Sequence, residues 1–146
     1  MKIRVEGTDL RGVIEGMRAL GKAAPEAAMR ILGQKAQDVA AKARTLCPDD
    51  PGTPGSTLRD SIRATKATRG QSGMISAAVI VGGSRLKGLL GSRAYNAIAV
   101  VQHEDMTLKH SHGQAKFLEQ PFLQTVPSVA DAVQAALDQE ADRVAG

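Results

Sequence analysis

The chain has 146 residues and 42% of them are hydrophobic, but only three are aromatic, namely Tyr95, Phe117 and Phe122. The formal net charge is +4, there is one cysteine, and no run approaches the ~20 apolar residues that span a bilayer. These values argue against a membrane-spanning helix, an internal disulfide and an aromatic core. They fit a single domain over residues 1–146. The start lacks the apolar stretch of a secretion signal, so we expect a protein kept in a cytosol-like compartment.

The charges are distributed unevenly along the chain. The net charge is +4 over residues 1–46, −2 over 47–56, +6 over 57–116 and −4 over 117–146. A basic middle and an acidic end can attract each other within one subunit or between neighbours, although a solvated polar surface gives the same pattern. The basic middle lacks the aromatic elements of a sequence-specific nucleic-acid reader. Non-specific contact with DNA stays open.

The first residues predict a short strand followed by a helix. Ile3 and Val5 alternate with charged residues, which is typical of a half-buried strand. Apolar side chains then recur at helical spacing over residues 10–20, and Gly21 is the kind of residue that ends a helix.

A second helix is predicted to begin at Pro25, because proline suits the first turn of a helix. It should end near Cys47, since Pro48 disfavours helical geometry in the residue before it. Residues 48–55 are rich in proline and glycine and predict a loop. One strand and two helices therefore account for residues 1–47.

The middle of the chain, residues 57–104, predicts the sheet. Residues 63–68 and 74–81 read as the two strands of a hairpin, and residues 97–103 as a further strand. Residues 82–94 contain four glycines and three basic side chains, which favours a mobile basic loop.

The C-terminal part, residues 117–146, predicts an anchor and a helix. Apolar residues at helical spacing continue to Val144, and Ser128 is a plausible cap for this helix. The large side chains before it predict an anchor to the sheet, formed by Phe117, Leu118, Pro121 and Phe122. The predicted fold class is α+β: an antiparallel sheet of about four strands, packed by two N-terminal helices and one C-terminal helix.

Candidate chemical groups are few. His103, His110 and His112 lie within ten residues, so a metal site or a small metal-binding enzyme is one hypothesis, but their spacing departs from the His-Glu-x-x-His pattern. Cys47 ends an apolar stripe and reads as a buried, inert side chain. Ser61 lacks the glycine-flanked elbow of a hydrolase. The sequence therefore predicts no catalytic residue, no cofactor and no metal.

Four short segments in order resemble the tail-completion or head-tail connector proteins of long-tailed bacteriophages. The segments are ARTLCPDD (residues 43–50), LRDSI (58–62), VVQHE (100–104) and GQAKFLEQPF (113–122). They are similar to the family's helix-ending motif, its Leu-Arg-x-Ser-Ile motif, its strand ending in His-Glu, and its Gly-x-Ala-Lys-Phe-Leu-Glu-x-Pro motif. The chain departs from the family in a longer loop over residues 51–57, and in Ile98 where the strand has a tyrosine.

The resemblance implies a structural virion protein at the neck or tail, assembled in the host bacterial cytoplasm as a homo-oligomeric ring, commonly a hexamer. Its implied partners are neck, head-completion and tail-tube proteins. We expect Arg85, Lys87 and Arg93 to face the ring channel or an adjacent ring, where they could contact DNA without reading its sequence. A tail-terminator protein that caps the tail tube is the alternative.

Overall fold

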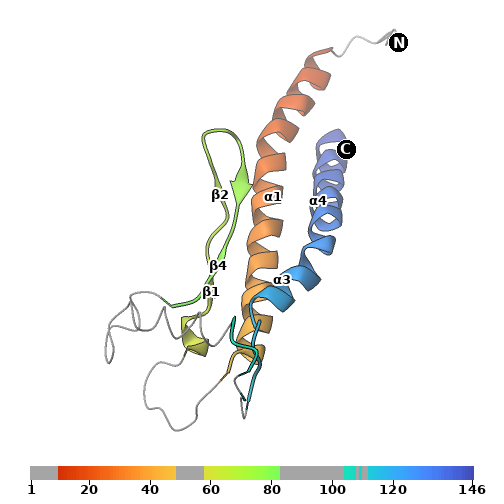
Figure 1. The fold of residues 1–146 in the computed structure, drawn as a ribbon. Helices are drawn as coiled ribbons and strands as arrows, with labels where there is room; N and C mark the ends of the chain where they lie inside the picture. Colours follow the sequence, from red (N-terminus) through yellow and green to blue (C-terminus); the bar gives the residue numbers. More distant parts are fainter. Residues whose placement is uncertain (1–9, 49–57, 83–103, 108, 110–111) are drawn as a thin grey trace.

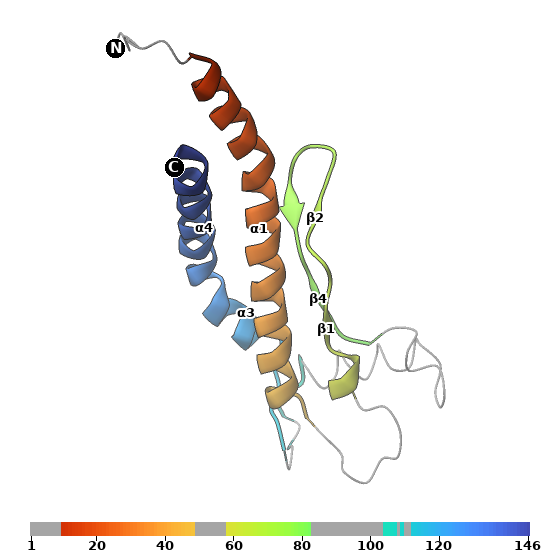
Figure 2. The same ribbon diagram turned by 180° about the vertical axis from the view of Figure 1, so that it is seen from behind.

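The structure is a computed structural model that describes residues 10–48, 58–82, 104–107, 109 and 112–146. Helix α1 lies between a β-hairpin on one side and helices α3 and α4 on the other, as both views show (Figures 1 and 2). The helices are α1 (Leu10–Leu46), α3 (Glu119–Thr125) and α4 (Pro127–Ala145). The arrangement confirms an α+β fold. No helix among the described residues is long and apolar enough to cross a membrane.

Helix α1 is continuous, so the predicted break between two N-terminal helices is wrong. Pro25 lies inside it, although an interior proline removes one hydrogen bond and costs about 3 kcal/mol. Helix α4 runs back along α1 and contacts it on both sides of Pro25. Lys35 donates a hydrogen bond to Ser128 (3.1 Å), and a Cβ on Gly16 would lie 3.6 Å from a methyl group of Val144. Packing over this length offsets the local cost.

The predicted hairpin is confirmed, and it contains a bulge. Strand β1 (Arg63–Ala64) pairs with β4 (Val79–Ile80), and β2 (Thr68–Arg69) pairs with β3 (Ile75–Ser76), both antiparallel. Between the two ladders, three residues of the first arm face two of the second, so the first arm carries one extra residue. Thr65 bridges this step, because its amide donates to the Ala78 carbonyl (2.7 Å) and its hydroxyl accepts from the Ala78 amide (2.9 Å).

The predicted four-stranded sheet is tested only in part. The other two predicted strands, residues 3–5 and 97–103, lie outside the described residues. In the part of the chain that the structure describes, the hairpin is the whole of the sheet. The hairpin ends in a tight turn in which the Gly70 amide donates to the Met74 carbonyl (2.8 Å), and Gly73 has a φ of +82°.

The prediction that Ser128 caps the C-terminal helix is wrong. Helix α4 begins at Pro127, and Val126, which joins it to α3, has helical backbone angles. The hydroxyl of Ser128 donates to the carbonyl of Thr125 (2.9 Å) instead of capping the helix from outside. Proline fits this first position, since the amide that it lacks would have no partner within the helix.

Candidate functional site

The sequence segments that resemble the phage family meet at the C-terminal end of α1. The junction cluster consists of five buried side chains: Ala40, Ala43, Cys47, Ile62 and Phe117. The last four of these come from three of the resembling segments, and Ala43, Cys47, Ile62 and Phe117 have no exposed surface. The motifs therefore build one packed unit that joins α1, the hairpin and the C-terminal helices.

Backbone groups at the end of α1 are satisfied by chain segments that are distant in sequence. The final carbonyls of a helix have no partner within it. At this end, the carbonyl of Leu46 accepts from the amide of Gln114 (2.8 Å), and that of Cys47 accepts from the guanidinium of Arg59 (3.2 Å). Both donors belong to resembling segments.

Gly113 allows this contact because it has no side chain. Its φ is +85°, which side chains rarely adopt. A Cβ there would lie 2.5 Å from the nitrogen of Pro48 and 2.6 Å from the carbonyl carbon of Cys47. Both are backbone atoms that cannot rotate away, so glycine is the residue that fits.

The start of the hairpin is fixed to α1 and to its own return arm by polar contacts. Two guanidinium nitrogens of Arg44 donate to the carbonyl of Ile62 (3.0 and 2.6 Å). The buried hydroxyl of Ser61 donates to the carbonyl of Leu58 (2.6 Å) and accepts from the amide of Gly82 (2.9 Å). Ser61 is thus engaged in positioning backbone.

Lys116 connects two resembling segments through charge. Its ammonium lies 2.5 Å from a carboxylate oxygen of Glu104 and 3.0 Å from one of Glu119. The hydrogen bond to Glu104, followed by that to Glu119, raises the pKa of Lys116. Its φ is +58°, which is uncommon for a residue other than glycine and turns the chain into α3.

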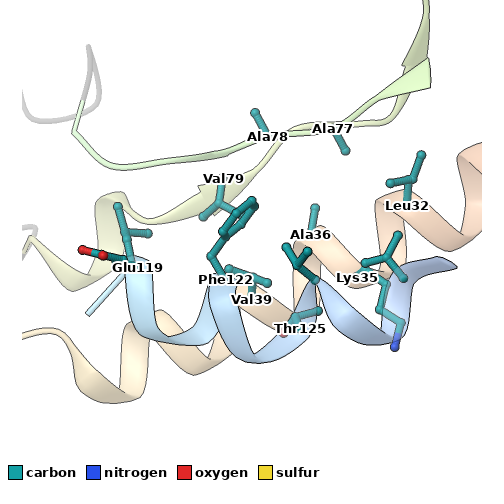
Figure 3. Close-up of a pocket in the computed structure, with 13 residues that line it drawn as sticks. Leu32, Lys35, Ala36, Val39, Ala77, Ala78, Val79, Glu119, Phe122 and Thr125 are labelled. Carbon is teal, nitrogen blue, oxygen red and sulfur yellow. The ribbon is translucent and has the colours of Figure 1, made fainter. Parts of the chain in front are cut away.

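Above the junction cluster, an apolar groove of about 580 Å³ runs between the hairpin and the C-terminal helices. Its floor is α1, through Leu32, Ala36 and Val39. Residues 77–79 of the hairpin form one wall, and residues 118–129 of α3 and α4 contribute the other (Figure 3).

The groove leaves large apolar side chains accessible to solvent. Phe122 is 55% exposed and Val126 46% exposed, although both line it. Thr125 also lines it and is only 6% exposed, and among the described residues its hydroxyl oxygen has no hydrogen-bond partner. An accessible apolar surface of this kind is typical of a protein interaction site.

The predicted anchor residues fall into two environments. Phe117 and Pro121 are fully buried and Leu118 is half-buried, whereas Phe122 is mostly exposed. The side chain of Phe122 extends over the groove and not into the junction cluster, so its expected burial is not observed. The anchoring role of the other three residues stays a prediction.

Several sequence predictions fall outside the described residues. These are Arg85, Lys87 and Arg93 of the basic loop, and His103 and His110 of the metal hypothesis. His112 is described and exposed. Within the ranges that the structure covers, no three histidine, cysteine, aspartate or glutamate side chains gather as metal ligands would.

The sequence reading missed the groove. Its lining comes from α1, the second arm of the hairpin and α3/α4, which are far apart along the chain. The spacing of the two phenylalanines gave no signal, because Phe117 precedes α3 and only Phe122 lies within it.

Comparison with known protein families gave one match. Residues 11–120, more than half of the chain, match the family described as "Bacteriophage HK97-gp10, putative tail-component". The comparisons with curated proteins and with solved structures gave no match. The matched range includes nearly all of α1, the hairpin and all of the junction cluster. The chain therefore belongs to the HK97-gp10-like family of bacteriophage tail components.

Proposed function

We propose that the protein is a ring-forming neck subunit, a head-tail connector that completes the tail and joins it to the head. A phage tail component is a structural part of the virion and contacts other tail or neck proteins. The described residues offer a packed junction and backbone-positioning contacts, which supports a structural role for the subunit.

The observation that carries the proposal is the accessible apolar groove. Exposed apolar surface of this kind marks a protein interaction site. The groove opens beside the hairpin and α3/α4, so a partner seated in it would contact three elements of the subunit at once. In a ring, each subunit joins its neighbours through two different surfaces, and a groove filled by a protruding part of the next subunit meets that requirement.

The charge distribution supports the same arrangement. The basic middle and the acidic end give each subunit regions of opposite sign, which favour head-to-tail contacts. In this ring, Arg85, Lys87 and Arg93 of the basic loop would face the channel or an adjacent ring and could neutralise DNA phosphates without sequence recognition.

The test of the ring is the mass of the purified protein, measured by light scattering and native mass spectrometry, with electron microscopy of the particles. We expect closed rings, with six copies of the 15.3 kDa chain as the first stoichiometry to look for. A protein that stays monomeric at concentrations of tens of micromolar, and that does not form rings on heads or tails, contradicts the proposal.

A second measurement separates the connector from the tail terminator. Labelled protein is mixed with DNA-filled heads and, separately, with polymerised tail tubes, and bound protein is recovered by sedimentation. A connector binds the filled heads. Binding confined to tube ends would instead assign the terminator role.

A further inference from the structure

The wall that the hairpin gives to the apolar groove is the edge of a strand. Thr65 and Ala78 are bonded to each other across the hairpin, and bonded and non-bonded pairs alternate in an antiparallel ladder. The next pair, Ala64 with Val79, is therefore a non-bonded one. Its N–H and C=O groups point away from the other arm, so Val79 directs a donor and an acceptor toward the groove side.

An extended peptide fits this groove better than a rounded small molecule. The strand edge can form backbone hydrogen bonds with an added strand. Side chains on one face of such a strand would contact Ala36 and Val39, while those on the other face would remain in water.

We propose that residues 2–6 of a second copy of this chain occupy the groove as an added strand; this inference rests on the proposed ring. The segment reads Lys-Ile-Arg-Val-Glu. Its strict alternation places Ile3 and Val5 on one face and the charged side chains on the other, which suits a groove open to solvent on one side.

The segment of the same chain cannot reach the groove. Leu32 is the groove residue of α1 nearest to its start, and it is 22 residues after Leu10, about 33 Å along the helix. Ile3 is seven residues before Leu10, so even a fully extended chain brings it back by only about 25 Å. A neighbouring subunit is free of this limit.

The start of α1 is itself positioned to meet another subunit. Its first turns extend beyond the tip of the hairpin and the end of α4 (Figures 1 and 2). Near this end of α1, where Gly16 lies beside Val144 of α4, Ile14 is 47% exposed and Met17 70% exposed. Apolar side chains on a protruding helix end would be covered when the segment before them docks on a neighbour.

Charge favours residues 2–6 over the uncharged apolar residues 97–101. The groove wall formed by α3 and α4 carries Glu119 and belongs to the part of the chain with a net charge of −4, while Lys35 lies on the α1 side of the lining. Lys2 and Arg4 would lie with Glu6 on the outer face of the added strand, and attraction between Glu119 and these two cations would favour this segment.

Substitution of the groove gives the first test. Phe122→Lys puts a charge into the groove at a position that is 55% exposed, so the subunit should keep its fold by circular dichroism. Leu123→Lys is the matched control, because Leu123 is 60% exposed on the same helix but is absent from the groove lining. We expect Phe122→Lys to lower the ring fraction at fixed concentration about tenfold or more, and Leu123→Lys to change it by less than about twofold. Equal effects of the two variants overturn the proposal.

Cross-linking identifies the occupant. Arg4→Cys protein is mixed with Ala78→Cys protein under mild oxidation, so that only a bond between subunits can join the two new cysteines; Cys47 is fully buried. We expect covalent dimers, and none when Gln71→Cys, in the exposed hairpin turn, replaces Ala78→Cys. Rings that form without this cross-link disprove the strand exchange but leave the ring standing. Absence of rings in the unmodified protein rejects the proposed function itself.

Two further outcomes also overturn the proposal. A chain with both Arg4→Cys and Ala78→Cys could form a bond within one subunit, seen as a monomer of altered mobility. A chain with Ala99→Cys and Ala78→Cys could do the same, which would mean that residues 97–103 occupy the groove. Either result in assembled rings shows that the groove is filled by its own chain.

Discussion

The junction cluster and the apolar groove lie next to each other on α1, but large apolar side chains are buried in the cluster and partly exposed in the groove. In the junction, Phe117 and Ile62 are fully buried. In the groove, Phe122 and Val126 are about half exposed, and the Thr125 hydroxyl has no partner among the described residues. In the proposed ring, the junction would stabilise the subunit, whereas the groove would be completed by assembly.

The two regions differ because their backbone groups are hydrogen-bonded to different extents. At the junction, the carbonyls of Leu46, Cys47 and Ile62 accept hydrogen bonds from distant segments, which brings those segments close enough to exclude water. At the groove, the hairpin presents the edge of a strand and no segment of the described chain covers it. An open strand edge beside apolar side chains is costly in water and favours pairing with another chain.

The largest expected effect comes from Phe117→Ala. Removing a fully buried aromatic ring costs about 3–5 kcal/mol of unfolding free energy, measured by denaturant titration. Phe122→Ala is the comparison, since this side chain is 55% exposed and its loss should cost below about 1 kcal/mol in the monomer. Similar losses for the two variants would erase the distinction between a sealed junction and an open groove.

Gly113→Ala should have the next largest effect, about 2–3 kcal/mol, because the new methyl group meets backbone atoms of Cys47 and Pro48 and the backbone angle is unfavourable. Gly73→Ala measures the angle alone. Its φ is +82°, but the nearest atom to the new Cβ is the end of the Arg69 side chain at 3.8 Å, so about 1 kcal/mol is expected. The difference between the stability losses of the two variants, measured by thermal unfolding, gives the cost of the steric clash alone. A difference near zero would mean that the chain near Gly113 shifts freely.

The elements with strong local patterns were predictable from the sequence. Apolar spacing identified the helical residues of α1, and the β-branched runs around Gly73 identified the hairpin. Pro25 misled the reading because its local preference to begin a helix is outweighed by packing of α4 along α1, which no local pattern reveals. At the bulge, the Ala78 amide donates a hydrogen bond to the side chain of Thr65, and an alternating apolar pattern does not predict such a contact.

The candidate site was also predictable only in part. The resembling segments predicted that Phe117 matters, and its burial follows from its position between Lys116, with its left-handed backbone, and the start of α3. The exposure of Phe122 was not predictable, because it depends on how far the hairpin lies from α3 across α1. That separation is a property of three elements together.

The smallest effects concern Lys116, where two contributions oppose each other. Both Lys116→Ala and Lys116→Gly remove the ion pairs with Glu104 and Glu119, but only glycine tolerates the φ of +58° without strain. The glycine variant should therefore be more stable than the alanine variant by about 1 kcal/mol, measured by thermal unfolding at neutral pH. Equal stabilities would show that the backbone relaxes when the ion pairs are lost.

The pH dependence of the unmodified protein tests the ion pairs separately. The folded-state pKa of Lys116 is raised above the ordinary value of a lysine, chiefly by the hydrogen bond to Glu104. Its stabilising contribution is therefore fully present below the unfolded pKa of about 10.4 and is lost as the pH rises through the folded value. Unmodified protein and Lys116→Ala should thus converge in stability above that pH, because both side chains share the unfavourable φ of +58°, whereas a gap that persists there would mean that Lys116 acts through packing. Because this contact bridges the segment before α3 to Glu104, convergence would also show that charge contributes to sealing the junction, in contrast to the groove.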